Sequence, residues 1–397
     1  MSRQVSMTQR PEKTSYEEWM EAEGVPIIEA PCGIEDTRAL ERKPWPRMGG
    51  KGNFIYLQGL KESGFTGMYV VEIPPHGALE PERHMYEEIL YGLQGNGTAE
   101  IWQDQPGPGA RGESQASGPL TAEGPARHTL EWGQGSVFAP PLNTWHRIYN
   151  LSAQPALILG VTTAPLVMDL YHNTEFVFGN PFSFLDRYSG RDDYFNVGKH
   201  VERAPGEHVV WDTNFIPDIR TSFVDNRERP KGHRVSIMGF EMSENVFTGL
   251  ISEWPVGIYH KAHYHGPGAV LLGLNSNGYV LLWSKELGIT PFQDGLGDQV
   301  VKLNWGEGSV YSPGDGWFHQ HFNTGREMAR HIAFRTGGAK YRLGMRSSER
   351  TPTVSIKQGG SLIEYEDEDP FIREQFEGAL AASGIESEMP DFRRVSS

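Results

Sequence analysis

The stretch GMYVVEIPPHGALEPERHMYEEILYGLQGNGTAEIW at Gly67–Trp102 recurs later in the chain as TGLISEWPVGIYHKAHYHGPGAVLLGLNSNGYVLLW at Thr248–Trp283. The two run together without a gap at an offset of 181 residues (248 − 67 = 181), which places His84 over His265. A second match places Gly135–Asn150 over Gly308–Asn323 at an offset of 173 (308 − 135 = 173), so that His146 meets His319. An internal repeat of this length predicts two copies of one domain.

Each copy consists of short apolar runs that are rich in β-branched and aromatic residues and are separated by Gly, Pro and Asn. Examples are MYVVEI and EILYGL in the first copy and LISEW and AVLLGL in the second. Many short strands without helices between them predict an all-β fold, an antiparallel sandwich or barrel. The eight extra residues of the first copy (181 − 173 = 8) fall in the Gly- and Pro-rich segment 105–127, which is expected to be a surface loop.

Five segments follow from the repeat and its surroundings. They are an N-terminal extension (1–49) with a short helix at Ser15–Glu23, a first barrel (50–165), an aromatic-rich interdomain segment (166–229), a second barrel (230–345), and a C-terminal tail (346–397). The interdomain segment is too aromatic for a free linker, so we expect it to pack across both barrels. The tail predicts a helix that Asp369 or an earlier acid caps, with Pro370 in the first turn and Gly384 at the end.

Composition narrows the class of protein. A chain of 397 residues favours two domains over one core. The net charge of −15 and the absence of a basic stripe argue against a nucleic-acid partner. Cys32 is the only cysteine, the N-terminus has no apolar signal region, and no apolar run could span a membrane. We therefore expect a soluble cytoplasmic protein with no membrane partner, and a homo-oligomer because exposed strand edges tend to pair.

The second copy carries a histidine set that is typical of a metal site. His263 and His265 are two residues apart, and on a strand this spacing puts both imidazoles on one face. His319 would close the cluster from another strand, and three neutral ligands leave coordination positions open. His321 should face the same side as His319, where it is a candidate general base, a fourth ligand or a hydrogen-bond partner. Nearby residues are expected to point away or to lie at the surface: His260, Tyr259, Trp317, Arg330 and Arg335.

The first copy carries a different set at equivalent positions. His84, Glu88 and His146 would form the two-histidine, one-carboxylate arrangement of non-haem Fe(II) oxygenases. Glu82 stands where the second copy has His263, and it would add a carboxylate that favours a harder ion such as Mn(II). The alternative is a hydrogen-bonded polar cluster that was left over after duplication.

These segments resemble the two signature motifs of the cupin superfamily. The first motif is Gly, five residues, His-x-His, three or four residues, Glu, six residues, Gly; the second is Gly, five residues, Pro-x-Gly, two residues, His, three residues, Asn. The resemblance covers about residues 50–165 and 230–345 and implies tandem double-stranded β-helix (jelly-roll) barrels, each with a metal site. Ala269 replaces the motif Glu in the second copy, which resembles the gentisate, salicylate and 1-hydroxy-2-naphthoate dioxygenases. In those enzymes the active barrel is usually the N-terminal one.

The leading hypothesis is therefore a metal-dependent dioxygenase. Fe(II) held by His263, His265 and His319 would bind a small hydroxylated substrate, such as an aromatic acid or an enediol, and O2 would cleave a C–C bond, with His321 as the candidate catalytic residue. The first alternative is a non-redox hydrolase, lyase or isomerase that uses Mn(II), Zn(II) or Ni(II) at the N-terminal site; Cu(II) is a further option for the ion. The second alternative is a non-catalytic ligand-binding protein with two barrels.

Overall fold

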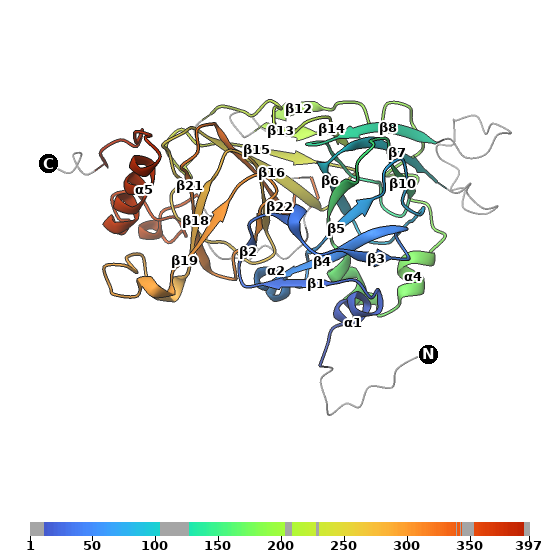
Figure 1. Cartoon of the computed structure of the whole chain (residues 1–397), viewed down its shortest axis with the longest axis horizontal. Coiled ribbons are helices and arrows are strands. Elements are labelled where there is room, and N and C mark those ends of the chain that lie inside the picture. Colours follow the sequence, from blue (N-terminus) through green and yellow to red (C-terminus); the bar gives the residue numbers. More distant parts are fainter. Residues whose placement is uncertain are drawn as a thin grey trace.

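The computed structural model describes residues 12–103, 127–202, 209–227, 230–338, 340–341, 343 and 353–392. Two β-barrels lie side by side, and the C-terminal helix covers the outer end of the second one (Figure 1). The tandem double-stranded β-helix fold that the cupin resemblance implies is thereby confirmed. The predicted surface loop falls outside the described residues, apart from Arg127.

The N-terminal barrel consists of an eight-stranded and a three-stranded sheet. In order across the large sheet, the strands are β1 (Ile27–Ala30), β4 (Gly50–Leu57), β5 (Gly67–Ile73), β11 (Ala156–Thr162), β6 (Glu88–Gln94), β9 (Val137–Phe138) and β14 (Phe215–Ile216), with β3 (Lys43–Trp45) beside β4. The small sheet has the order β10 (Trp145–Asn150), β7 (Asn96–Trp102), β8 (His128–Gly133). Strands β5 and β11 are buried on both faces, and successive residues such as Val70 and Val71 belong to two different apolar clusters, as period-2 side chains require.

The C-terminal barrel repeats this plan except at the outer edge of the large sheet. Its large sheet has the order β12 (Lys199–Glu202), β13 (Val209–Asp212), β15 (Ser236–Glu241), β16 (Phe247–Trp254), β22 (Ala329–Thr336), β17 (Val270–Asn275), β20 (Val310–Tyr311), β2 (Gly33–Ile34). At the outer edge β12 pairs with β13, whereas β3 pairs with β4 in the N-terminal barrel. Its small sheet has the order β19 (Val301–Trp305), β18 (Gly278–Ser284), β21 (Trp317–Asn323). The left-handed turn before each motif-two histidine is also repeated, since Asn143 (φ 57°) stands where the second barrel has Gly316 (φ 65°).

Helices occupy the ends and connections of the chain. They are α1 (Ser15–Ala22), α2 (Gln58–Ser63), α3 (Ala164–Tyr171), α4 (Thr174–Gly179) and α5 (Pro370–Ala382). Both predicted helices are confirmed. Asp369 caps α5 by accepting a hydrogen bond from the Phe371 amide at 3.0 Å. None of the helices in the described part of the chain is long and apolar enough to cross a membrane.

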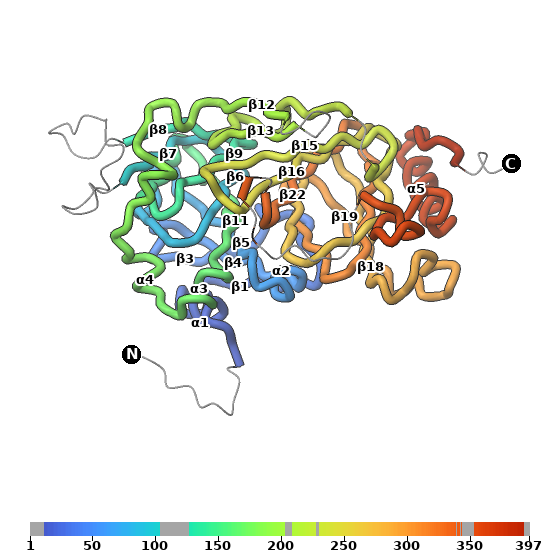
Figure 2. The backbone as a smooth tube through the Cα atoms, turned by 180° about the vertical axis from the view of Figure 1, so that it is seen from behind, coloured from blue at the N-terminus to red at the C-terminus, as the bar shows by residue number. Residues whose placement is uncertain are grey.

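The segments that precede the barrels cross over reciprocally. Strand β2, which comes before the N-terminal barrel, pairs with β20 of the C-terminal barrel, and β14, which comes before the C-terminal barrel, pairs with β9 of the N-terminal barrel. The connecting segment with β12 and β13 runs along one edge of the molecule (Figure 2). The aromatic-rich interdomain segment thus contacts both barrels, as expected.

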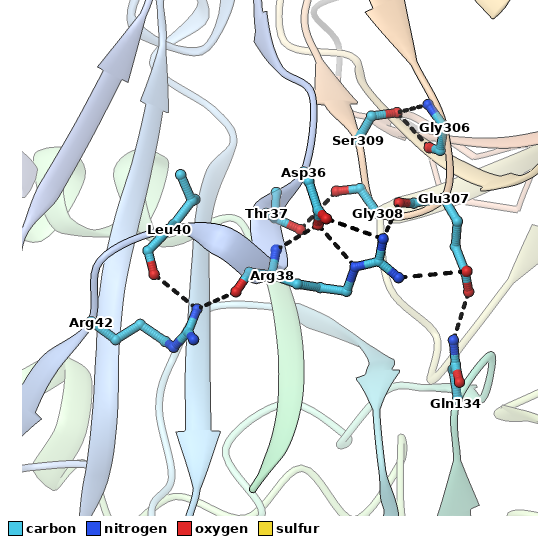
Figure 3. A network of polar contacts seen from close by, with 10 residues as sticks. All are labelled: Asp36, Thr37, Arg38, Leu40, Arg42, Gln134, Gly306, Glu307, Gly308 and Ser309. Carbon is cyan, nitrogen blue, oxygen red and sulfur yellow. Dashed lines mark hydrogen bonds and ion pairs between the residues drawn. The ribbon is translucent and has the colours of Figure 1, made fainter. Parts of the chain in front are cut away.

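At each crossover an Asp forms an ion pair with the Arg two residues later, and we call this pair with its neighbouring backbone contact the Asp-x-Arg bracket. Asp36 and Arg38 hold each other, and Thr37 donates a backbone hydrogen bond to the Gly308 carbonyl at 3.0 Å (Figure 3). Asp218 and Arg220 form the same bracket against Gly135, at an offset of 182 (218 − 36 = 182). The repeat therefore extends beyond the barrels into the segments that link them.

One carboxylate connects the two brackets between the barrels. Glu307 accepts a hydrogen bond from Gln134 at 2.6 Å, and Gln134 occupies the equivalent position in the first barrel (Figure 3). Arg38 and Arg220 lie 3.5 and 3.8 Å from the two oxygens of this carboxylate. A single apolar cluster, which includes Val70 and Ile332, also contains residues of both barrels. Burial of this shared apolar surface stabilises the contact between the two barrels.

Candidate metal centres

The C-terminal cluster is built from two segments that face each other inside the barrel. His263 and His265 follow β16, and His319 lies on β21. His263 and His319 exchange backbone hydrogen bonds of 3.3 and 2.9 Å, which fixes the two segments in register. The His-x-His segment is held by isolated β-bridges, so the expectation of a regular strand there was wrong. The three histidines nevertheless offer ring nitrogens that all lie within 4.8 Å of one another.

The contacts of the Nδ1 atoms determine which ring nitrogen of each histidine can bind a metal ion. Each Nδ1 lies within hydrogen-bond distance of a backbone carbonyl: 3.2 Å for His263, 2.8 Å for His265 and 3.2 Å for His319. A ring that donates its Nδ1–H keeps a lone pair on Nε2, and this is how metal-binding imidazoles are oriented. Burial lowers the pKa of all three imidazoles, that of His265 to about 4, so the rings stay neutral. The donor set therefore fits a divalent transition-metal ion.

A lysine that the motifs do not include enters this cluster. Lys231, just before β15, places its Nζ 2.9 Å from Nε2 of His263. Burial, followed by the charge of Arg335, lowers the pKa of Lys231 to about 7. The ammonium group donates to the lone pair that a metal ion would take, so an ion at this cluster requires Lys231 to turn away from His263. Nothing in the spacing of the histidines could have indicated this residue.

The cluster opens into a cavity of about 50 Å³. Apolar side chains, among them Leu250 and Leu271, line it together with the histidines. Lys231 and Arg335 are both part of the lining. Three further imidazoles also line the cavity, namely those of His260, His321 and His331. His321 lies outside the group of three, with its ring centroid 5.5 Å from that of His319.

Several surrounding side chains differ from expectation. His260 is buried and lines the cavity, so the prediction that it faces away was wrong; its irregular segment does not follow the period-2 alternation of a strand. Tyr259 and Arg330 are also buried rather than exposed. Arg330 forms an ion pair with Glu253 and donates to a carbonyl of the interdomain segment at 2.7 Å. Arg335 lines the cavity, although part of it is exposed.

The N-terminal cluster occupies the equivalent place in the first barrel. Glu82, His84 and His146 offer ligand atoms that lie within 4.8 Å of one another. Glu88 Oε2 lies 3.4 Å from His84 Nε2 and 3.7 Å from His146 Nε2. The other oxygen of Glu88 accepts a hydrogen bond from Tyr69 at 2.9 Å. All four residues that the sequence singles out are thus brought together.

Two buried atoms of this cluster indicate that it fits a cation. His84 Nδ1 lies 2.8 Å from the Tyr86 carbonyl, so His84 Nε2 carries the lone pair. This Nε2 and the facing Glu88 Oε2 are buried and make no hydrogen bond among the described residues. Two acceptors that face each other in the interior repel unless a proton or a cation lies between them. Although burial opposes it, contact with Glu82 raises the pKa of His146, which shows how strongly the carboxylates attract positive charge.

Arg47 covers the N-terminal cluster from the side of the N-terminal extension. Its guanidinium group forms ion pairs with Glu82 and Glu23. It also packs over Trp19 and Phe178, at 5.5 and 4.8 Å from their ring centroids. Despite the burial of Glu82, the Arg47 charge holds the pKa of that carboxyl well below its usual range. Arg47 lies outside both motifs, and the sequence offers no signal for this contact.

These observations define a class: a two-barrel protein with the bicupin fold and one candidate metal centre in each barrel. No family model matches the sequence, and no curated protein matches it significantly. Among solved structures, a point variant of Bacillus subtilis oxalate decarboxylase is similar at 12% identity, with a TM-score of 0.45, over 80% of this chain and 79% of that one. A structure of the same enzyme at pH 4.6 is similar at 13% identity, with a TM-score of 0.44, over 78% and 77%.

Proposed function

We propose that the chain is a metal-dependent oxygenase of small hydroxylated acids or enediols, and that its C-terminal barrel does the chemistry. The observation that carries the proposal is the cluster of three neutral imidazoles, without a carboxylate, at the end of a cavity that also contains Lys231 and Arg335. Because the ligands add no negative charge, an ion there would keep its full charge and favour an anionic chelating substrate.

The protein side chains have distinct roles in this proposal. His263, His265 and His319 would hold the ion, and the carbonyl contacts of their Nδ1 atoms would keep them oriented. When bound, Fe(II) would supply a binding site for the substrate and the redox chemistry that oxygenation requires. Lys231, displaced from His263, would pair with an acidic group of the substrate, and Arg335 would add positive charge in the same cavity.

The volume of the cavity favours a small substrate. A water molecule needs roughly 10–15 Å³, and an apolar cavity of about 150 Å³ accommodates benzene. With Lys231 in contact with His263, a cavity of about 50 Å³ suits a substrate of a few heavy atoms better than a hydroxylated aromatic acid. The cavity volume therefore favours an enediol or a short hydroxy acid over the aromatic acid that the sequence hypothesis also names.

The proposal is tested by oxygen consumption. The purified chain would be loaded anaerobically with Fe(II) and supplied with a panel of short hydroxy acids and enediols, with hydroxylated aromatic acids as the comparison set. We expect consumption with a member of the first set, and its loss in His319→Ala. Turnover that continues unchanged without oxygen would exclude an oxygenase and favour a non-redox reaction.

The N-terminal cluster supports a second candidate function, a non-redox metal enzyme. His84 Nε2 and Glu88 Oε2 are buried, face each other and make no hydrogen bond among the described residues, and the carboxylate-rich donor set suits Mn(II). This candidate predicts oxygen-independent turnover that is lost in Glu88→Gln and retained in His319→Ala. The opposite pattern would exclude it.

A further inference from the structure

Two imidazoles of the C-terminal cavity are joined by one tyrosine. The hydroxyl group of Tyr311, on β20, lies 3.0 Å from Nδ1 of His321 on β21 and 2.6 Å from Nδ1 of His331 on β22. All three side chains are at most 3% exposed. His321 and His331 line the cavity, whereas Tyr311 lies behind them. Tyr311 occupies a variable position of the second motif, and His331 lies outside both motifs.

A single hydroxyl proton constrains the protons of both rings. Burial raises the pKa of Tyr311 well above its usual range and lowers the pKa of His331 to about 3. The described residues that line the cavity beside His321 include no carboxylate that could stabilise a charged ring, so the buried His321 is neutral too. A neutral imidazole carries one N–H, and a hydroxyl group donates only one hydrogen bond. If neither ring carried a proton on Nδ1, the hydroxyl could donate to only one of them, and the other contact would have no donor. If both rings carried a proton on Nδ1, the buried Tyr311 hydroxyl would have no acceptor for its own proton among the described residues. One ring must therefore donate from Nδ1 and the other must accept.

The two distances assign these roles. Hydrogen bonds donated by O–H groups are shorter than those donated by N–H groups, with typical separations of about 2.7–2.8 Å and about 2.9–3.0 Å. The 2.6 Å contact therefore corresponds to Tyr311 O–H donating to His331, and the 3.0 Å contact to His321 Nδ1–H donating to the tyrosine oxygen. A ring with its proton on Nδ1 keeps the lone pair on Nε2.

We propose that Tyr311 and His331 hold His321 in the Nδ1–H form, so that its Nε2 is a hydrogen-bond acceptor for a hydroxyl group of the substrate. The inference rests on the proposed function of the C-terminal cavity and narrows its substrate class to compounds that carry a hydroxyl near the chelating group. Tyr311 and His331 are positioning residues, since they act through His321. An analogue without the hydroxyl would leave this acceptor unpaired in a buried site, which is a strong basis for discrimination.

The proton positions can be measured without turnover. Long-range ¹H–¹⁵N correlation spectra of the full chain with ¹⁵N-labelled histidine distinguish protonated from unprotonated ring nitrogens. Spectra would be recorded with and without Zn(II), which is diamagnetic, and His321→Gln and His331→Gln would assign the two rings. We expect the proton on Nδ1 in His321 and on Nε2 in His331. A wild-type His321 with its proton on Nε2 would overturn the inference.

Tyr311→Phe should remove the contact that keeps the His321 proton on Nδ1, and Tyr279→Phe is the matched control. Tyr279 lies in the same barrel, is 3% exposed, and its hydroxyl makes no hydrogen bond among the described residues. We expect Tyr311→Phe to give His321 a population with the proton on Nε2 and to raise the KM for a hydroxylated substrate about tenfold, with metal content unchanged. Tyr279→Phe should change neither. An unaltered proton pattern in Tyr311→Phe would overturn the inference, while absence of any turnover in wild type would count against the proposed function alone.

Discussion

In the N-terminal cluster two carboxylates face two imidazoles, whereas in the C-terminal cluster three imidazoles face a lysine. The positions are equivalent in the repeat, because Glu82 corresponds to His263 and Glu88 to Ala269 (269 − 88 = 181). The first cluster attracts positive charge and is covered by Arg47, and the second keeps its imidazoles neutral beside an open cavity. Two substitutions within one scaffold thus separate a carboxylate-rich cluster that Arg47 covers from an all-imidazole cluster that, in the proposed function, would accept an anionic substrate.

Removal of one histidine from each cluster should have the largest effect on turnover, and the effect should differ most between the two barrels. We expect His319→Ala to lower oxygen-dependent turnover by about 10³-fold or more, because it removes the contribution of the ion, which amounts to several kcal/mol. His146→Ala should retain most of the activity. Initial rates from an oxygen electrode measure both, and equal losses in the two variants would remove the functional distinction between the barrels.

Arg47→Met tests how charge is balanced in the N-terminal cluster. The variant leaves the buried Glu82 without its main ion-pair partner, and breaking such a pair costs about 3 kcal/mol or more. We expect a lower free energy of unfolding in metal-free protein and a smaller loss with Mn(II) present, because the ion would supply the missing positive charge. Calorimetric melting with and without Mn(II) measures this difference. The same loss under both conditions would mean that no ion binds near Glu82.

Ala269→Glu gives the C-terminal barrel the carboxylate that Glu88 provides in the other. Ala269 lines the cavity, so the new group would face the three histidines and Lys231. We expect divalent ions to bind about tenfold more tightly and an anionic substrate to bind more weakly. Titration calorimetry with Mn(II) measures the first effect, and Ala269→Gln controls for side-chain size. If the Gln variant behaves like the Glu variant, charge is not the cause.

The Asp-x-Arg brackets at the crossovers should contribute least to the free energy of unfolding. Although partial burial opposes it, Arg38 lowers the pKa of Asp36, and Arg220 does the same for Asp218. A lowered pKa in the folded state contributes stability that is present above the unfolded value of 3.8 and is lost as the pH falls through the folded value. Because both pairs are partly exposed, Asp218→Asn should cost only about 0.5–1 kcal/mol at pH 7. Urea unfolding should show a smaller loss at pH 3, below the unfolded value, than at pH 7.

Much of the fold could be predicted from the sequence because duplication leaves a regular signal. The two matching stretches give both barrels, and the alternation of short apolar runs gives their strands. The crossover was missed although its signal was present: Ile34, Asp36 and Arg38 recur as Ile216, Asp218 and Arg220 at an offset of 182. Between residues 33–38 and 215–220 only three of six residues are identical, so the match becomes recognisable only when the structure shows that the two segments are equivalent.

The metal-site candidates were predictable and their surroundings were not. The seven candidate ligands occur at motif spacing, and the structure brings them together in two clusters. Lys231 and Arg47 come from irregular segments whose paths depend on tertiary packing. His331 had a local signal, since His331, Ala333 and Arg335 alternate along β22 and all line the cavity. That alternation becomes informative only when the inward face of the strand is known.

The most direct test of the account is metal content by elemental mass spectrometry on tag-free protein, for wild type, His265→Ala and His84→Ala. We predict that the wild-type chain binds an ion in the C-terminal barrel that His265→Ala loses and His84→Ala keeps, and that any second ion shows the reverse pattern. If His265→Ala keeps the full metal content while His84→Ala loses it, the C-terminal cluster is not the metal centre and the proposed function fails.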